Sequence, residues 1–202
     1  MTPRDPLPLP VEPQTPHTRL ARRVQAAVEQ RGEAAVAGLA VRLLSGAVTP
    51  EDVTSGAARA VTGDDAALTP AATGALALST VWHRRAVPAL TDALGADALD
   101  VRAAALLVLA VRADALRADA LVDRALVERV REAAGDAHSE VREAAASALG
   151  ALARAEDLER VEPVLSAMVM DLDPGLAAAA ELALAQLAAR LDRPDLDPAP
   201  QD

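Results

Sequence analysis

The chain has 202 residues, about half of them hydrophobic and a quarter charged, and its net charge is −10. This composition is that of a globular protein of one ordinary domain. The negative charge argues against general nucleic-acid binding, because neutralising phosphates requires a surplus of cations. The lack of cysteine excludes disulfides, thiol nucleophiles and cysteine metal sites.

The residue types that are missing indicate the base composition of the genome that encodes the chain. The sequence contains no Phe, Tyr, Ile, Lys or Asn, all of which are encoded by codons whose first two bases are A or T. We infer a GC-rich bacterial genome. This bias also explains the abundance of alanine and the use of arginine for every fixed cation.

Prolines mark the two ends of the chain. Six of the fourteen lie within residues 1–17, and three lie in the last ten residues. We therefore predict extended or disordered tails over 1–17 and 193–202, the second also acidic, around a helical domain over 18–192. The longest apolar run, 103–111, is far short of the roughly 20 residues that span a bilayer. With no apolar core for a signal peptide, we expect a cytoplasmic protein that does not contact membranes.

A helical repeat organises the domain. After Asp136, small and apolar residues from Val141 to Leu152 follow the 3, 4, 7, 8, 11 spacing of one helix stripe. The same pattern starts at Val101 and at Leu176, 40 residues earlier and 35 residues later. Such periods are typical of a helical solenoid. The spacing predicts about five antiparallel helix pairs, 18–31 with 33–46, 50–62 with 66–81, 84–96 with 99–114, 118–134 with 138–154, and 157–171 with 174–191.

The internal prolines fit these helices in two ways. Pro50, Pro70 and Pro174 each follow a Thr or Asp that can cap a helix, so they are expected at the first helical position. Pro88 and Pro163 each precede an aliphatic marker by thirteen residues. They are expected inside the preceding helix, where a proline produces a kink.

These markers resemble the HEAT-repeat family, in particular the HEAT-like repeats of bilin lyases. The family pattern is a proline in an outer helix, an aspartate, and a Val-Arg pair that opens an Ala/Leu-rich inner helix. The resemblance covers residues 84–191, with three departures. The acid of the first of these repeats is displaced to Asp97, Glu128 replaces the proline of the second, and Ala177 stands where the third should have arginine. It implies an all-α right-handed superhelix that binds other proteins. The residues that carry it are Pro88, Val101, Arg102, Asp136, Val141, Arg142, Pro163, Asp171 and Leu176.

Apart from the resemblance, Asp136 has a structural interpretation. It can cap the helix that follows, or pair with Arg142 six residues later and order the turn between two helices.

Nothing in the sequence predicts a catalytic, cofactor or metal site. The three histidines lie apart, and none has the second His or adjacent Glu of a helical zinc site. The pairs Asp64-Asp65 and Asp171-x-Asp173 could bind a cation, but both are expected at helix starts, where capping explains them more simply.

Two features suggest a partner surface. Trp82 lies beside Arg84 and Arg85, and Trp and Arg are the residues that anchor interfaces, although a lone Trp can equally pack beneath a bend. In the last helix, an apolar face around Leu182 replaces the polar face expected of a terminal helix. It could hold a second copy or a partner protein, or the exposed alanines could be harmless.

Three functions therefore remain open. The first is a non-catalytic scaffold or adaptor for an unknown protein partner. The second is an accessory subunit or a HEAT-like enzyme of lyase or glycosylase type, although a glycosylase would need more aromatic residues than one Trp. The third is weak nucleic-acid binding through residues 17–42, which carry five Arg against two Glu.

Overall fold

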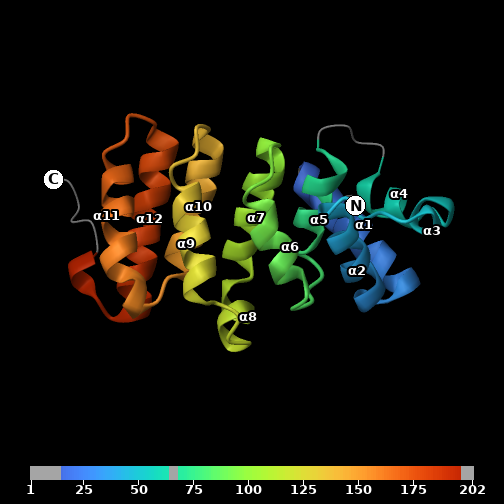
Figure 1. Cartoon of the computed structure of the whole chain (residues 1–202), viewed down its shortest axis with the longest axis horizontal. Coiled ribbons are helices and arrows are strands. Elements are labelled where there is room, and N and C mark those ends of the chain that lie inside the picture. Colours follow the sequence, from blue (N-terminus) through green and yellow to red (C-terminus); the bar gives the residue numbers. More distant parts are fainter. Residues whose placement is uncertain (1–14, 64–67, 197–202) are drawn as a thin grey trace, which may run out of the picture.

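The computed structural model describes residues 15–63 and 68–196, and helices are the only regular secondary structure in this part of the chain. The helices follow one another along the long axis of the molecule (Figure 1). None of the described helices is long and apolar enough to cross a lipid bilayer. The α-helices are α1 Pro16–Arg31, α2 Glu33–Leu44, α3 Pro50–Thr54, α4 Ala57–Thr62, α5 Pro70–Ala77, α6 Ala86–Ala93, α7 Leu99–Val111, α8 Ala113–Ala118, α9 Arg124–Ala133, α10 Ser139–Leu152, α11 Leu158–Val169 and α12 Pro174–Leu191. Two 3₁₀ turns, η1 Ala155–Asp157 and η2 Pro194–Leu196, flank α11 and α12.

The helix starts predicted at Thr-Pro and Asp-Pro are confirmed. The hydroxyl of Thr69 accepts a hydrogen bond from the amide of Ala72 at 3.2 Å, and the carboxylate of Asp173 accepts from Gly175 at 3.0 Å. Each cap satisfies an amide that the first helical turn would otherwise leave unpaired. Pro50 starts α3 in the same way.

Both ends of the helical domain extend beyond the predicted limits. Pro16 is the first residue of α1 and Thr15 caps it, so the predicted tail over 1–17 ends too late. At the other end, η2 packs on α12 and buries Leu196, so residues 193–196 belong to the folded part and not to the tail. The rest of both predicted tails, 1–14 and 197–202, lies outside the described residues.

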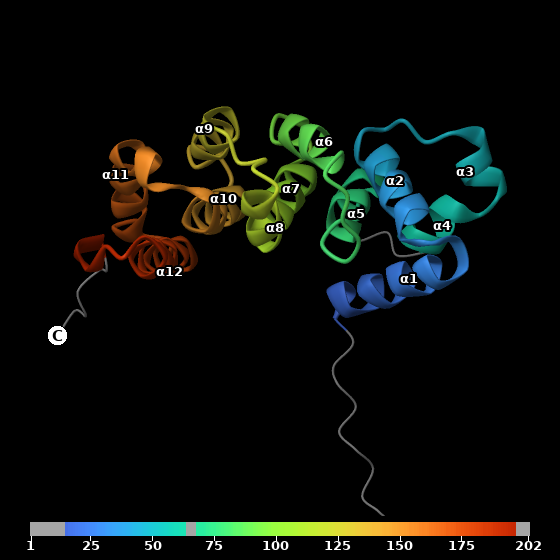
Figure 2. The same cartoon turned by 90° about the horizontal axis from the view of Figure 1, so that it is seen from below.

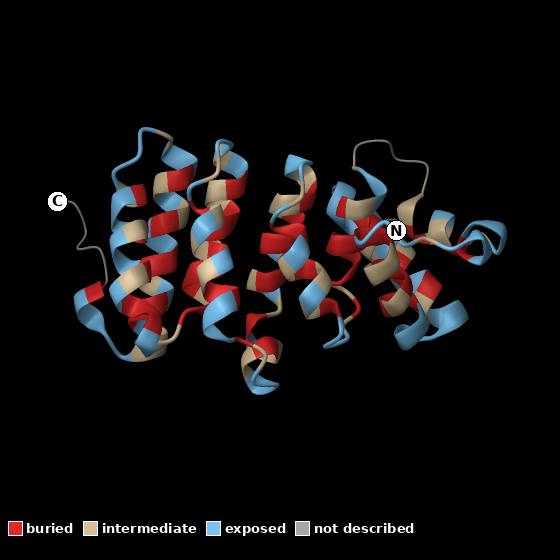
Figure 3. Ribbon diagram, viewed as in Figure 1, coloured by how far each residue is buried: buried red, intermediate tan, exposed pale blue. Residues whose placement is uncertain are grey.

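Five helices form a row that carries the core. α2 packs on α5, α5 on α7, α7 on α10, and α10 on α12. In Figure 2, α6, α9 and α11 lie along one side of the molecule and α7, α10 and α12 along the other. The buried residues line the faces that the helices turn toward each other (Figure 3). They include Val141, Leu149 and Leu176, none of which exposes any surface, as the stripe pattern predicts.

Close approach along this row depends on glycine at two crossing points. A Cβ atom on Gly150 of α10 would lie 2.7 Å from Ala183 Cα of α12, and one on Gly74 of α5 would lie 2.7 Å from Ala40 O of α2. Both neighbours are main-chain atoms, which cannot move aside. The interhelical distance at these points therefore requires the absence of a side chain.

The predicted helices are wrong at several boundaries. The helix expected over 50–62 is broken at Gly56, whose φ of 70° is left-handed. The one expected over 118–134 begins only at Arg124, after a turn in which Ala120 has a φ of 53°. Pro88 is the third residue of α6 and not an interior residue. Because amides of the first turn have no intrahelical acceptor, it does not disturb the helix. Pro163 does lie inside α11, as predicted.

Candidate functional site

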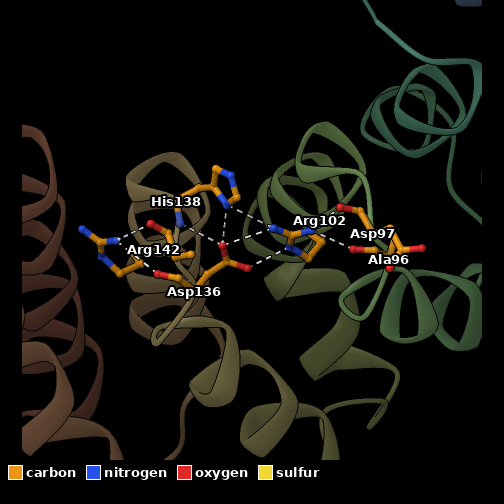
Figure 4. Close-up of polar contacts among 7 residues, drawn as sticks. Ala96, Asp97, Arg102, Asp136, His138 and Arg142 are labelled. Atoms are coloured by element: carbon orange, nitrogen blue, oxygen red, sulfur yellow. Dashed lines mark hydrogen bonds and ion pairs between the residues drawn. The ribbon is translucent and has the colours of Figure 1, made fainter.

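The predicted marker Asp136 lies in the turn between α9 and α10, and its partner is not the predicted one. Its carboxylate accepts hydrogen bonds from Arg102 Nε at 2.8 Å and Arg102 Nη2 at 3.1 Å, and from the amide of His138 at 2.9 Å (Figure 4). Arg102 lies 34 residues earlier, at the start of α7. Pairing with this guanidinium is the main reason that the pKa of Asp136 falls to about 2.

Arg142 has a different role from the predicted ion pair. Its Nη1 donates to the carbonyls of Asp136 and Ala137, at 3.1 and 3.3 Å. Arg102 Nη1 does the same for Ala96 and Asp97, both at 2.8 Å. The donors and acceptors of the two sets are each 40 residues apart. Corresponding arginines thus hold corresponding turns, which accounts for the Val-Arg pair as a structural feature.

The third turn lacks this arginine, because Ala177 stands in its place. The carboxylate of Asp171 accepts a hydrogen bond from the amide of Asp173 at 2.9 Å, as Asp136 does from His138. Leu172 between them is fully exposed. Asp171 and Asp173 therefore have local capping roles, and the described residues include no group of three or more His, Asp or Glu that could hold a metal. Asp64 and Asp65 lie outside the described residues.

Trp82 is half-buried at the bend before α6, where Arg112 covers its ring. The guanidinium carbon of Arg112 lies 5.7 Å from the ring centroid. The same guanidinium donates to the carbonyls of Leu78 and Ser79 at 3.0 and 2.6 Å, which ties the end of α7 to the end of α5. Burial lowers the pKa of Arg112. These contacts are those of a residue packed beneath a bend, whereas the neighbouring Arg84 and Arg85 are exposed.

Leu182 lies in a depression formed by three helices. It is 61% exposed and shares a pocket of about 220 Å³ with Val111, which is 66% exposed. The pocket is lined by residues of α7, α10 and α12, so Leu182 borders a depression that these neighbouring helices share. The sequence analysis identified the apolar face of α12 but did not single out Val111, which it placed within a longer helix over 99–114.

A second pocket continues this depression toward α8. It has a volume of about 480 Å³ and shares Ala110, Val111, Ala151 and Gln186 with the first. We call the combined depression the inner-face groove. Its far end is formed by Asp114, Arg117 and Arg190. Two of these residues come from α8, a short helix that the sequence did not predict.

The two arginines at this end are held by the C-terminal carbonyls of α10. Arg190 Nη2 donates to Gly150 O at 2.9 Å and Ala153 O at 2.6 Å. Arg117 donates to Ala151 O and to the carboxylate of Asp114. Burial lowers the pKa of Arg190, and the charge of nearby Arg117 lowers it further. Arginine titrates so far above neutral pH that Arg190 stays charged despite this lowering.

The arginines of the first helix pair are largely used within the fold. Arg23 donates to Val61 O at 3.1 Å, and Arg31 to Ser55 O at 2.9 Å. Arg42 pairs with the buried carboxylate of Asp52 at 2.8 and 2.6 Å, which keeps the pKa of that carboxyl well below its usual range. These three contacts fasten α3 and α4 to α1 and α2, so they do not present a row of cations to nucleic acid.

No family model matches this chain, and none of the curated proteins compared with it matches either.

Proposed function

We propose that the chain is a HEAT-like helical-repeat protein that binds another protein, without catalysis, in the inner-face groove. The observation that carries this proposal is the exposure of Val111 and Leu182 in one groove across α7, α10 and α12. Large apolar side chains gathered in a concave surface mark binding sites on protein surfaces.

Two features support the repeat interpretation. The equivalent contacts of Arg102 and Arg142 recur after 40 residues, and the row from α2 to α12 places each inner helix against the next. In solenoids, stacking of repeats produces an extended concave surface of this kind. The groove lies on the helices that would form that surface.

Photo-crosslinking tests the proposal directly. Gln186 is exposed and lines both pockets, so a benzoylphenylalanine at this position would contact a bound partner. We expect irradiation in a lysate of the source organism to give a discrete crosslinked species, identified by mass spectrometry. Adding Leu182→Glu to the same chain should remove it, because a carboxylate would have to be buried against an apolar partner.

The matched control carries the crosslinker at Glu162, an exposed position on α11. It should not give the same species. A crosslink that forms equally at both positions, or that survives Leu182→Glu in a folded variant, would refute binding in the groove.

A further inference from the structure

The chemistry of the inner-face groove changes along its length. One part is apolar, since Val111 and Leu182 stand over a floor of alanines such as Ala151 and Ala183. Such a floor lets a bound segment approach closely. With volumes of about 220 and 480 Å³, the two pockets have room for several side chains of a peptide.

The other part carries an excess of positive charge. Arg117 and Arg190 lie close enough to repel each other, and Asp114 is the one carboxylate in the lining of this pocket. The side chain of Asp114 is 97% exposed, so its ion pair with Arg117 is weak. The carbonyls of α10 fix both guanidinium groups in position but bring only partial negative charge. A fixed and partly buried cation without a full counter-charge favours an anionic partner group.

Three acids of the last helix pair do not supply this counter-charge. Asp157 is fully buried at the N-terminal end of α11 and pairs with Arg154 and Arg160. Asp171 and Asp173 lie in the turn before α12, at the opposite end of that helix from Arg190. These three carboxylates therefore have other partners in the fold, and Asp114 is the acid whose charge acts on Arg190.

From this arrangement we propose that the groove binds a segment of a partner protein that combines an apolar side chain with a carboxylate. The apolar side chain packs between Val111 and Leu182, and the carboxylate meets Arg117 and Arg190. This inference rests on the proposed function and specifies the chemistry of the partner.

Peptide selection against the full chain tests it. The probe is a phage-displayed library of random 16-residue peptides, followed by anisotropy measurements with fluorescein-labelled copies of the enriched sequences. We expect enrichment of peptides in which Leu, Ile, Val or Met is accompanied by Asp or Glu. Binding should weaken at least tenfold with Leu182→Glu and with Arg190→Gln, and less than threefold with Arg190→Lys, which keeps the charge. Val53→Glu, at an exposed site on α3, is the control that should change nothing.

A double-mutant cycle isolates the charge pair. Replacing the peptide Glu by Gln should weaken binding to the wild type about tenfold but have little effect on Arg190→Gln. The Glu→Gln change in the peptide leaves the protein unchanged. Its effect on binding to the wild type therefore still tests the charge pair if Arg190→Gln does not fold. Peptides that depend on Leu182 but tolerate Glu→Gln would overturn the charge assignment and leave the proposed function standing.

The other possible occupants give different results, and each overturns the inference. A dimer in light scattering that Leu182→Glu converts to a monomer would show that a second copy fills the groove. A deletion of residues 1–14 that tightens peptide binding tenfold would show that this segment of the chain fills it. Failure to enrich any peptide would also overturn it, while the crosslinking experiment would still report on the proposed function.

Discussion

Asp136 and Arg102 illustrate how single side chains join neighbouring helix pairs in this protein. The side chains of both are about 13–14% exposed, and the guanidinium meets the carboxylate through two nitrogens. At the same time, Arg102 holds the carbonyls of its own turn. One side chain therefore fixes a turn and a contact between two pairs.

The pH dependence of stability follows from the depressed pKa of Asp136. A carboxyl with a pKa of about 2 in the folded state, against 3.8 as the ordinary value, stabilises the fold above pH 4 and loses this effect as the pH falls toward 2. We expect Asp136→Asn to lower the free energy of unfolding by about 1–2 kcal/mol at pH 7. At pH 3 the gap from wild type should shrink to roughly half. Urea unfolding at a series of pH values measures both.

The control for this change is Asp97→Asn. Asp97 contributes its carbonyl to Arg102, and its side chain is exposed, so the substitution should leave stability within about 0.5 kcal/mol of wild type. If the difference in unfolding free energy between Asp136→Asn and wild type stays constant down to pH 3, the ion pair with Arg102 is not the origin of that difference.

At the level of the helices, the close approach of α10 to α12 is made possible by Gly150. Gly38 in α2 is the useful comparison, because a Cβ atom there would meet only the side-chain end of Arg42 at 3.5 Å. The two glycines share a helical backbone and differ in what surrounds them.

We expect opposite effects from one added methyl group at these sites. Gly38→Ala should stabilise the protein by up to about 1 kcal/mol, since alanine is the better helix former. Gly150→Ala should destabilise it by about 1–2 kcal/mol, because overpacking against the backbone of Ala183 outweighs that gain. Thermal unfolding of both variants checks the signs. Stabilisation by Gly150→Ala would show that α10 and α12 are farther apart than the structure has them.

The helices themselves were largely predictable, and the limits of the prediction have physical causes. Periodic stripes identified α7, α10 and α12, since burial imposes the 3.6-residue spacing on the sequence. The break at Gly56 and the turn at Ala120 that delays the start of α9 depend on single left-handed residues, which do not alter that spacing. The partner of Asp136 could not be predicted, because Arg102 belongs to the previous helix pair and the sequence shows only local neighbours.

The groove was predictable in part. The apolar face of α12 is visible in the sequence, and its exposure around Leu182 agrees with the prediction. Its other walls are formed by residues 31 to 72 positions before Leu182, and α8 is too short to give a periodic signal. A groove shared by four helices has no signature in any one of them.

For the molecule as a whole, the row of helices predicts uneven stability. α10 packs against α7, α8, α9 and α12, whereas α3 contacts mainly α4. Helices with few neighbours open at lower free energy, because little buried surface holds them. We expect hydrogen exchange monitored by mass spectrometry to be slowest in α7 and α10 and fastest in α3. Uniform protection along the chain would contradict an array built from contacts between neighbours.

The position of Trp82 gives the protein a built-in spectroscopic reporter. The chain has one tryptophan and no tyrosine, so all of its intrinsic fluorescence arises at the junction where Arg112 covers the indole. Emission during denaturation therefore follows the separation of α5 from α7, while far-ultraviolet circular dichroism follows every helix at once. If the two curves coincide, the chain unfolds as one cooperative unit. If they separate, their order shows whether the junction at Trp82 opens before or after the remaining helices.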